Sequence, residues 1–546
     1  MKASDLLVKC LENEGIQYVF GIPGEENLDF LDSLRDSSIR LIVTRHEQAA
    51  GFMAATVGRL TGIPGVALST LGPGATNFTT PAAYAQLGGM PLLMISGQKP
   101  IRSKKQGLFQ IVDIVRMMNP LTKFTEQVSY ENEIPSLVRE AVSKAKAERP
   151  GATHLELPED IAANAATTDV IEFEEENSVK VPERTIEVAA EKIKKAKSPL
   201  LLIGAGANRE YLCKAFEYFL EKTGIYTFCT QMGKGVVDER NSHFLQAAAL
   251  SAHDHVHCAV EKSDLVICVG HDPREKPPFI MTDDGPEVIH INYYPSRSDA
   301  LYFPQMEVIG TVCDAMYRLS DKLEDHKDWD FSYFERLKEH LKVKLADGSD
   351  DERFPMIPQR IVAEMRKVMP DDGVIALDNG MYKLWFARHY ETRMPNTLLL
   401  DNALATMGAG VPSGMAAKLV HPERKVVAVC GDGGFMMNSQ EIETAVREKI
   451  DMVILVLNDS GYGMIKWKQD NMKLDSFGLD FNNPDFVKYA ESYGANGHRI
   501  EKIEELAQTV EEAFDFGGVH IIDVPIDYSV NGQLSAENLK KEACIS

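Results

Sequence analysis

Two short apolar runs in the last third of the chain each end at an acidic residue. Residues 426–430 are followed by Gly431-Asp432-Gly433-Gly434, and residues 453–457 are followed by Asn458-Asp459. The helical pattern between them predicts two parallel strands joined by a crossover helix. Because such strands end at the same edge of a sheet, Asp432 and Asp459 are expected to lie together there. Two carboxylates beside a glycine turn that opens a helix suit Mg²⁺ and a diphosphate.

Each half of this pattern is weak when taken alone. An Asp-Gly dipeptide is most often only a turn, and the structural interpretation is the better one for Gly431-Asp432-Gly433 by itself. The second acid at a neighbouring strand end favours a shared role as metal ligands. Mg²⁺ needs about six oxygen ligands, so a backbone carbonyl near Gly461 and two diphosphate oxygens would complete the shell.

Length, charge and cysteine usage limit the class of protein. The chain has 546 residues, which suits about three domains, and its net charge is −23. An acidic balance disfavours nucleic acid and anionic membrane surfaces as partners, but it does not exclude an anionic substrate. The eight cysteines form no C-x-x-C pair, so we expect buried free thiols rather than disulfides or zinc, and a cytoplasmic location.

The sequence predicts an α/β protein with three doubly wound parallel-sheet domains, over residues 1–168, 186–325 and 355–530. In each block short apolar runs alternate with helical patterns, with glycine or proline between them. Two charged, polar segments, 169–183 and 325–352, are interpreted as connections. The first residues predict an amphipathic helix rather than a signal peptide, and no apolar run is long enough to span a membrane.

The G-D-G turn, its spacer and the following N-D match the thiamine-diphosphate motif. The sequence thereby resembles the acetolactate synthases, within the pyruvate-oxidase-like group of thiamine-diphosphate enzymes, over nearly its whole length. This resemblance implies pyrimidine-binding, central and diphosphate-binding domains in that order. It also implies that Asp432, Asp459 and the carbonyl of Gly461 bind Mg²⁺. The motif more often has asparagine at position 459, and aspartate adds a negative charge.

Glu47 follows the predicted strand 41–43. An isolated glutamate there is best interpreted as a first-turn acid favoured by the helix dipole. The resemblance implies instead that its carboxyl contacts N1′ of the cofactor's aminopyrimidine and promotes the imino tautomer that deprotonates thiazolium C2. In the family the pyrimidine domain of one subunit meets the diphosphate domain of another, so Glu47 and Asp432 should meet across a dimer interface. We therefore expect at least a homodimer, and a homotetramer as the fuller assembly.

The resemblance assigns the other site residues, although turns, core packing and a buried aromatic would explain the same residue types. Met407 would separate the two cofactor rings, the Ala405 carbonyl would accept from the 4′-amino group, and Gln110 would act in catalysis facing the keto acid. Further cofactor-binding residues would be Gly24, Gly72, Asn77, Asn379, Gly380, Met381, Gly433, Gly434, Tyr462, Gly463 and Met464. The substrate pocket would include Phe109, Gln110 and Trp467.

The expected reaction is decarboxylation of pyruvate and carboligation to a second pyruvate, giving 2-acetolactate and CO₂ for branched-chain amino acid or acetoin metabolism. A simple 2-keto acid decarboxylase is the alternative; the adjacent His-His pair typical of pyruvate decarboxylases does not occur here. A non-catalytic homologue would not need Glu47. The turn at Gly204-Ala205-Gly206 lacks the third glycine of a dinucleotide site. Because 270–273 resembles the flavin-free catabolic branch, we expect no FAD.

Overall fold

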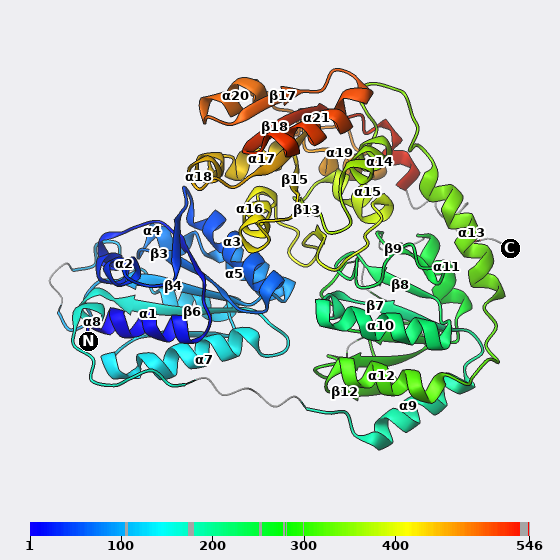
Figure 1. Ribbon diagram of the computed structural model, residues 1–546, viewed down its shortest axis with the longest axis horizontal. Helices are drawn as coiled ribbons and strands as arrows, with labels where there is room; N and C mark the ends of the chain where they lie inside the picture. Colours follow the sequence, from blue (N-terminus) through cyan, green and yellow to red (C-terminus); the bar gives the residue numbers. More distant parts are fainter. Residues whose placement is uncertain are drawn as a thin grey trace.

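The computed structural model describes residues 1–103, 107–172, 179–250, 254–276, 279, 281–298, 300–534 and 544. Three open sheets, each with six strands, form three domains, and every pair of neighbouring strands is parallel. Figure 1 shows the first domain on the left, the central domain on the right and the third above both. The expected α/β class with three doubly wound parallel sheets is confirmed.

The first sheet has the order β2-β1-β3-β4-β6-β5. Its strands are buried in most positions, as expected for a parallel sheet covered by helices on both faces. The strands are β1 (Tyr18–Gly21), β2 (Arg40–Val43), β3 (Gly65–Ser69), β4 (Leu92–Gln98), β5 (Phe124–Gln127) and β6 (Ala152–Pro158). The helices are α1 (Ala3–Asn13), α2 (Leu28–Arg35), α3 (Glu47–Thr61), α4 (Pro73–Thr76), α5 (Thr79–Gly88), α6 (Ile114–Met118), α7 (Ile134–Lys146) and α8 (Glu159–Ala163).

The central sheet has the order β12-β11-β10-β7-β8-β9, which places β9 at one edge. A long helix, α13 (Ser332–Ala346), follows this domain and runs along its outer side towards the third domain (Figure 1). The strands are β7 (Pro199–Ile203), β8 (Thr227–Thr230), β9 (Phe244–Ala248), β10 (Leu265–Val269), β11 (Glu287–Asn292) and β12 (Met306–Ile309). The helices are α9 (Glu183–Lys195), α10 (Glu210–Thr223), α11 (His255–Lys262) and α12 (Val312–Leu323).

The third sheet has the order β14-β13-β15-β16-β18-β17, so the two strands that precede the acidic residues are neighbours. The strands are β13 (Val374–Leu377), β14 (Leu398–Leu399), β15 (Val426–Gly431), β16 (Met452–Asn458), β17 (Asn496–Arg499) and β18 (Val519–Pro525). The helices are α14 (Pro358–Val368), α15 (Met381–His389), α16 (Gly410–Val420), α17 (Asp432–Asn438), α18 (Glu441–Arg447), α19 (Gly463–Asn471), α20 (Phe486–Ser492) and α21 (Ile503–Phe516).

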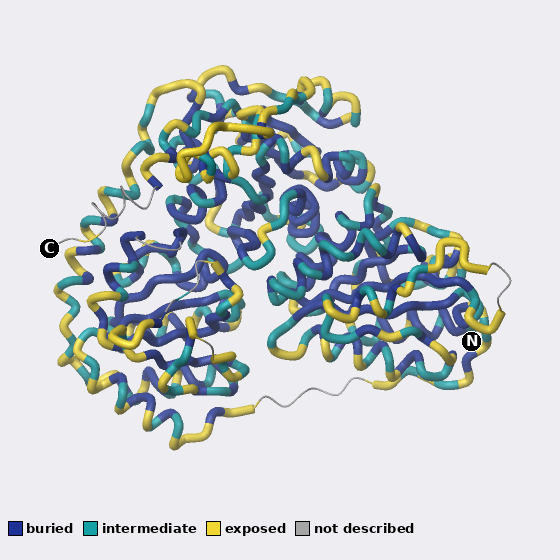
Figure 2. Tube along the Cα trace, turned by 180° about the vertical axis from the view of Figure 1, so that it is seen from behind, coloured by how far each residue is buried: buried dark blue, intermediate teal, exposed yellow. Residues whose placement is uncertain are grey.

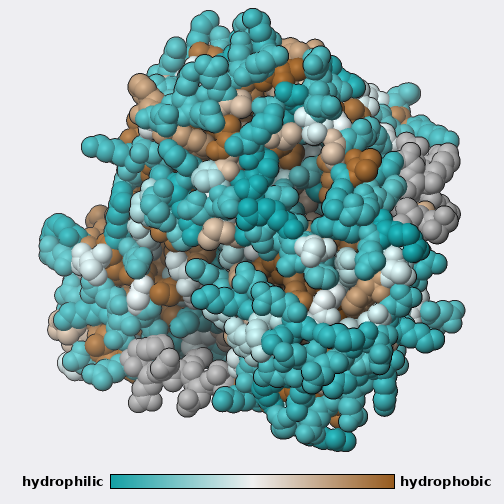
Figure 3. Space-filling model, turned by 45° about the vertical axis from the view of Figure 1, so that its right-hand side comes forward, coloured by the Kyte–Doolittle hydropathy of each residue, from teal (hydrophilic) through white to brown (hydrophobic). Residues whose placement is uncertain are grey.

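The first and third domains share one hydrophobic core. Helices α3 and α16 pack against each other, and the Thr56 hydroxyl donates to the Ser413 hydroxyl across the contact at 3.0 Å. Buried residues therefore continue from one domain into the other (Figure 2). Hydrophilic side chains cover most of the face in Figure 3, with smaller hydrophobic areas between them. Across the described residues, no helix combines the length and apolar character needed to traverse a bilayer.

The expectation of free cysteines is wrong for one pair. Cys258 on α11 forms a disulfide with Cys544, while the other six cysteines are free thiols. The two partners lie 286 residues apart, so no local spacing in the sequence indicates the bond. It ties the end of the chain to the central domain.

Candidate active site

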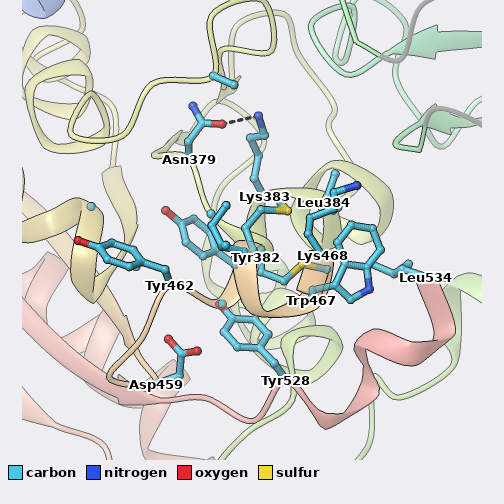
Figure 4. Close-up of a pocket in the computed structure, with 18 of the residues that line it drawn as sticks. Asn379, Tyr382, Lys383, Leu384, Asp459, Tyr462, Trp467, Lys468, Tyr528 and Leu534 are labelled. Atoms are coloured by element: carbon cyan, nitrogen blue, oxygen red, sulfur yellow. Dashed lines mark hydrogen bonds between the residues drawn. The ribbon is translucent and has the colours of Figure 1, made fainter. Parts of the chain in front are cut away.

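A cavity of about 1050 Å³ opens at the carboxyl ends of β13, β15 and β16, where parallel sheets bind their ligands. In Figure 4, Asp459, Tyr462 and Tyr528 lie on one side of it, and Trp467, Leu384 and Leu534 lie on the other. Most of the predicted cofactor residues line this cavity, together with the predicted metal ligand Gly461 and the predicted substrate residue Trp467. The cofactor residues are Asn379, Gly380, Met381, Ala405, Met407, Asp432, Gly433, Gly434, Asp459, Tyr462, Gly463 and Met464.

Asp432 is buried and held by three hydrogen bonds. It follows β15 directly, begins α17 and is 1% exposed. Its Oδ1 accepts from the Gly433 amide at 2.8 Å, and its Oδ2 accepts from the Ser460 amide and from Asn483 Nδ2, both at 2.7 Å. These bonds orient the carboxylate, although burial raises its pKa above the usual range. The Ser460 bond also ties the end of β15 to the loop after β16.

Asp459 brings a second negative charge to the same place. Burial, and then the nearby charge of Asp432, raise the pKa of Asp459 to about 7. Two carboxylates that disfavour each other's charge are stabilised by a divalent cation between them. Together with the Gly461 backbone in the same cavity wall, they form an oxygen donor set that fits Mg²⁺.

Glycine is required at several positions beside these acids. A Cβ at Gly434 would lie 2.3 Å from Asp378 Oδ2, and a Cβ at Gly433 would lie 2.8 Å from the Tyr462 ring. The cavity wall therefore consists of backbone at the start of α17. Backbone amides at this position suit the anionic oxygens of a diphosphate.

Buried acids hold the segment that carries Ala405 and Met407. Asp401 Oδ2 accepts from the Ala405 amide at 2.7 Å, and Asp378 Oδ2 accepts from the Gly408 amide at 2.9 Å. Ala405 has a φ of 58°, in the left-handed region that alanine rarely occupies. A strained residue held by its neighbours is typical of a functional position.

Lys383 is a site residue that the sequence interpretation missed. Its Nζ donates to Asn379 Oδ1 at 2.5 Å, to the Asp401 carbonyl at 3.0 Å and to Asn402 Oδ1 at 3.3 Å. Burial lowers its pKa to about 8. The ammonium joins the turn before α15 to the segment that carries Ala405 (Figure 4). The sequence signal for this contact is the position of the lysine, four residues or one helical turn after Asn379.

The remaining predicted residues form a second group in the first domain. Glu47 begins α3, is 8% exposed, and its Oε2 accepts from Asn77 Nδ2 at 2.9 Å. A Cβ at Gly72 would lie 2.8 Å from the Gln110 carbonyl, so the loop with Gln110 covers that turn. Gly24 packs in the same way against Thr70, because a Cβ at Gly24 would lie 2.4 Å from the Thr70 Cβ.

The two groups do not share the cavity within one chain. Glu47, Gly24, Gly72, Asn77, Phe109 and Gln110 are absent from the described residues that line it. Phe109 is 67% exposed, which is unusual for a large apolar side chain that lines a pocket. One chain thus carries two separate groups of predicted residues, one with the Glu47 carboxyl and one with the paired aspartates.

Comparison with known proteins identifies the family. Residues 1–117 match the N-terminal TPP-binding domain of thiamine pyrophosphate enzymes, residues 186–319 match the central domain, and residues 378–524 match the C-terminal TPP-binding domain. The chain belongs to the thiamine pyrophosphate enzyme family. The Glu47 group therefore lies in the N-terminal TPP-binding domain of the family, and the paired aspartates lie in the C-terminal one.

Three relatives of this family member cover nearly its whole length. Acetolactate synthase from Bacillus subtilis is 33% identical over 99% of this chain and 96% of the relative. The catabolic acetolactate synthase of Raoultella terrigena is 32% identical over 98% of this chain and 96% of the relative. A probable acetolactate synthase large subunit from Methanocaldococcus jannaschii is 30% identical over 96% of this chain and 92% of the relative.

The geometry of the acidic pair leads to a first prediction. Asp432→Ala should weaken Mg²⁺-dependent retention of thiamine diphosphate by about a hundredfold or more, because it removes one metal ligand and the anchor for Ser460. Asp459→Asn should retain binding, because its amide oxygen still coordinates and the repulsion is removed. Calorimetric titration of the cofactor with and without Mg²⁺ measures both effects.

Asp470 provides the matched control, since it lines the same cavity but lies on α19, away from the strand ends. Asp470→Ala should leave cofactor retention unchanged. Unchanged retention in Asp432→Ala, or an equal loss in Asp470→Ala, would contradict the assignment of the metal site.

Proposed function

We propose that the protein is a thiamine-diphosphate- and Mg²⁺-dependent acetolactate synthase that decarboxylates pyruvate and joins the remaining two-carbon unit to a second pyruvate. The products are 2-acetolactate and CO₂. The observation that carries this proposal is the combination of Glu47 with Asp432 and Asp459 in a chain whose near-full-length relatives are named acetolactate synthases. Cofactor binding alone would need the aspartates but not the glutamate.

The chain's own residues would hold the cofactor from two sides. Asp432, Asp459 and the Gly461 carbonyl would bind Mg²⁺, and the backbone of the 379–381 and 431–434 turns would bind the diphosphate. When bound, thiamine diphosphate supplies the electron sink that makes decarboxylation possible. Asn77 orients the Glu47 carboxyl through their 2.9 Å hydrogen bond, so that it can exchange a proton with the aminopyrimidine N1′.

The wall around Trp467 favours carboligation over simple decarboxylation. Trp467 donates from Nε1 to the Asn531 carbonyl at 3.1 Å and packs with Leu250, Met381 and Leu534 in one apolar cluster. An apolar wall that is fixed in this way excludes water from the neighbouring space, which reduces protonation of the reactive carbon. An acceptor keto acid can then react there instead. Phe109 and Gln110 would complete the acceptor side.

The separation of the two partial sites supports a homodimer as the catalytic unit. Among the described residues that line the cavity with Asp432 there is no glutamate. The exposed Phe109 and the loop with Gln110 lie beside the Glu47 group and would be covered by a second subunit. In a symmetric dimer each site would take Glu47 from one chain and Asp432 from the other.

The glycine turn of the central domain supports a flavin-free enzyme. Its Ala205 amide, the type of group that would face a phosphate, already donates to Glu275 Oε1 at 2.8 Å. Gly206 donates to the Gly270 carbonyl at 2.8 Å, so the turn packs on its neighbour. A buried carboxylate thus occupies the position of an anion, and burial raises the pKa of Glu275 to about 7. This donor set does not fit a dinucleotide phosphate.

The products of pyruvate distinguish the proposed reaction from its main alternative. With thiamine diphosphate and Mg²⁺, purified protein should convert two pyruvates to one acetolactate and release CO₂ in a ratio of about one to one with acetolactate. Acetaldehyde as the main product would identify a simple decarboxylase instead. Asp432→Ala serves as the inactive control.

Glu47 can be tested together with the dimer. Glu47→Gln should keep cofactor affinity and lower turnover by about a hundredfold or more. Coexpression of Glu47→Gln with Asp432→Ala chains should restore about a quarter of wild-type activity, because half of the dimers are mixed and each contains one intact site. No restoration in isolated mixed dimers would rule out a shared site, and near-normal turnover of Glu47→Gln would rule out its role.

The flavin proposal has a direct spectroscopic test. Protein purified without added cofactors and then incubated with FAD should show no flavin absorbance after gel filtration. Stoichiometric flavin that remains bound to the wild-type protein would contradict the interpretation of Glu275.

A further inference from the structure

A second cavity, of about 690 Å³, lies between the central and third domains, apart from the active site. Its walls are β9 and α13 on one side and α14 and α15 on the other. Figure 1 places α13 beside β9 and α11, with α14 and α15 above them. The volume falls within the range of small-molecule sites.

The cavity is cationic in a protein that is strongly acidic overall. Lys338 and Lys342 lie one helical turn apart on α13, and Arg366 and Lys367 are neighbours on α14. Arg388 and Arg393 also line the cavity, but they are neutralised, Arg388 by Asp254 and Arg393 by Asp371 and Glu391. Glu239 and Glu391 are the acidic side chains among the described lining residues. Such a concentration of charge attracts anions.

Two of these cations have no carboxylate partner among the described residues. Lys338 donates to the backbone carbonyls of Asn241 and Phe244. Arg366 donates to the Tyr390 hydroxyl at 2.8 Å and to the Glu391 carbonyl at 3.0 Å, besides the carbonyls of residues 369 and 370.

Other charged groups near them are already paired. Lys342 pairs with Glu339 at 2.5 Å and Lys367 with Glu364 at 2.7 Å. Glu239 pairs with Lys234 at 2.6 Å. Burial, followed by the charge of Lys342, lowers the pKa of Lys338, although Glu239, Glu391 and Glu339 oppose this shift. A bound anion would relieve the remaining positive charge.

The same cavity contains buried polar atoms without partners. Gln246, in the middle of β9, is 1% exposed, and within the described part of the chain neither its Nε2 nor its Oε1 makes a hydrogen bond. Gln359 Oε1 and Arg366 Nε are likewise buried and unpaired there. Such groups carry a free-energy penalty unless a ligand or water satisfies them. An amide that lacks both a donor and an acceptor partner suits a planar polar group such as a nucleobase edge.

Apolar side chains lie between the charged groups. Leu341 and Leu345 on α13 and Val362 and Ala363 on α14 also line the cavity. We propose that this cavity binds an organic phosphate of nucleotide size, with its phosphates near the lysines and its planar body between the leucines and the buried Gln246 amide. Cations, apolar walls and an unsatisfied amide in one space match the three parts of such a ligand.

The second cavity shares two elements with the active site. Helix α15 starts at the Met381 turn of the first cavity and ends at Arg388 and His389 in the second. Strand β9 contributes Gln246 to the second cavity, and Ala249 directly after it lines the first. A ligand between α13 and α15 is thus in direct contact with an element that positions the diphosphate turn.

ADP is the probe, titrated calorimetrically into holoenzyme saturated with thiamine diphosphate and Mg²⁺, so that the first cavity is filled. We expect ADP to bind with a Kd that rises with salt, and adenosine to bind at least about tenfold more weakly because it carries no charge. Gln246→Leu and Lys342→Gln should each weaken ADP binding by about tenfold. Lys342 is partly exposed, so its replacement preserves the fold.

Lys194→Gln on the outer helix α9 is the matched charge control and should bind ADP as the wild type does. Thermal unfolding of each variant, compared with the wild type, verifies that the fold is retained. Absence of ADP binding to the holoenzyme would overturn the proposal. Equal affinity for adenosine, or affinity unchanged in both Gln246→Leu and Lys342→Gln, would also overturn it.

Discussion

The pairing of β15 with β16 is the constraint on which the site depends. The two strands are parallel and Gly431 lies opposite Leu457, so both strands end at the same edge of the sheet. Asp432 and Asp459 follow directly after them. Burial raises the pKa of both side chains, and the negative charge of Asp432 raises the pKa of Asp459 further. Two neighbouring carboxylates are stable there when a bound cation compensates their negative charge. The glycine turns and the Ala405 segment, which is fixed by Asp401 and Asp378, lie around this edge of the sheet.

Strand ends with local sequence signals could be predicted. The apolar runs before Asp432 and Asp459 correspond to β15 and β16, and the turn at Asn379 follows β13. Strand β9 is apolar except for Gln246 in its centre, and this interruption hides it in the sequence. The spacing of Lys383 from Asn379 indicates their mutual contact, but its bond to the Asp401 carbonyl is a tertiary contact that this spacing does not encode. The Cys258–Cys544 bond escaped prediction for the same reason.

The proposed catalytic groups lie in two domains and do not share a cavity among the described residues of one chain. The first domain provides Glu47, fixed by Asn77, and the third provides the paired acids. The two domains are nevertheless joined through the packing of α3 against α16, with Thr56 hydrogen-bonded to Ser413. In the proposed symmetric dimer, pairing of two such protomers would bring both groups together at two sites at once. The central domain contributes Leu250 and Lys276 to one cavity and Gln246 to the other.

The central claim is that the two aspartates and the cofactor's diphosphate share one divalent ion. Replacing Mg²⁺ with Mn²⁺ and recording the ³¹P spectrum of bound thiamine diphosphate tests this directly, because a paramagnetic ion broadens only nearby nuclei. We predict strong broadening of both phosphorus resonances in the wild-type protein and its loss in Asp432→Ala. Sharp resonances with Mn²⁺ bound, or cofactor that binds equally well after removal of divalent ions by a chelator, would contradict the account.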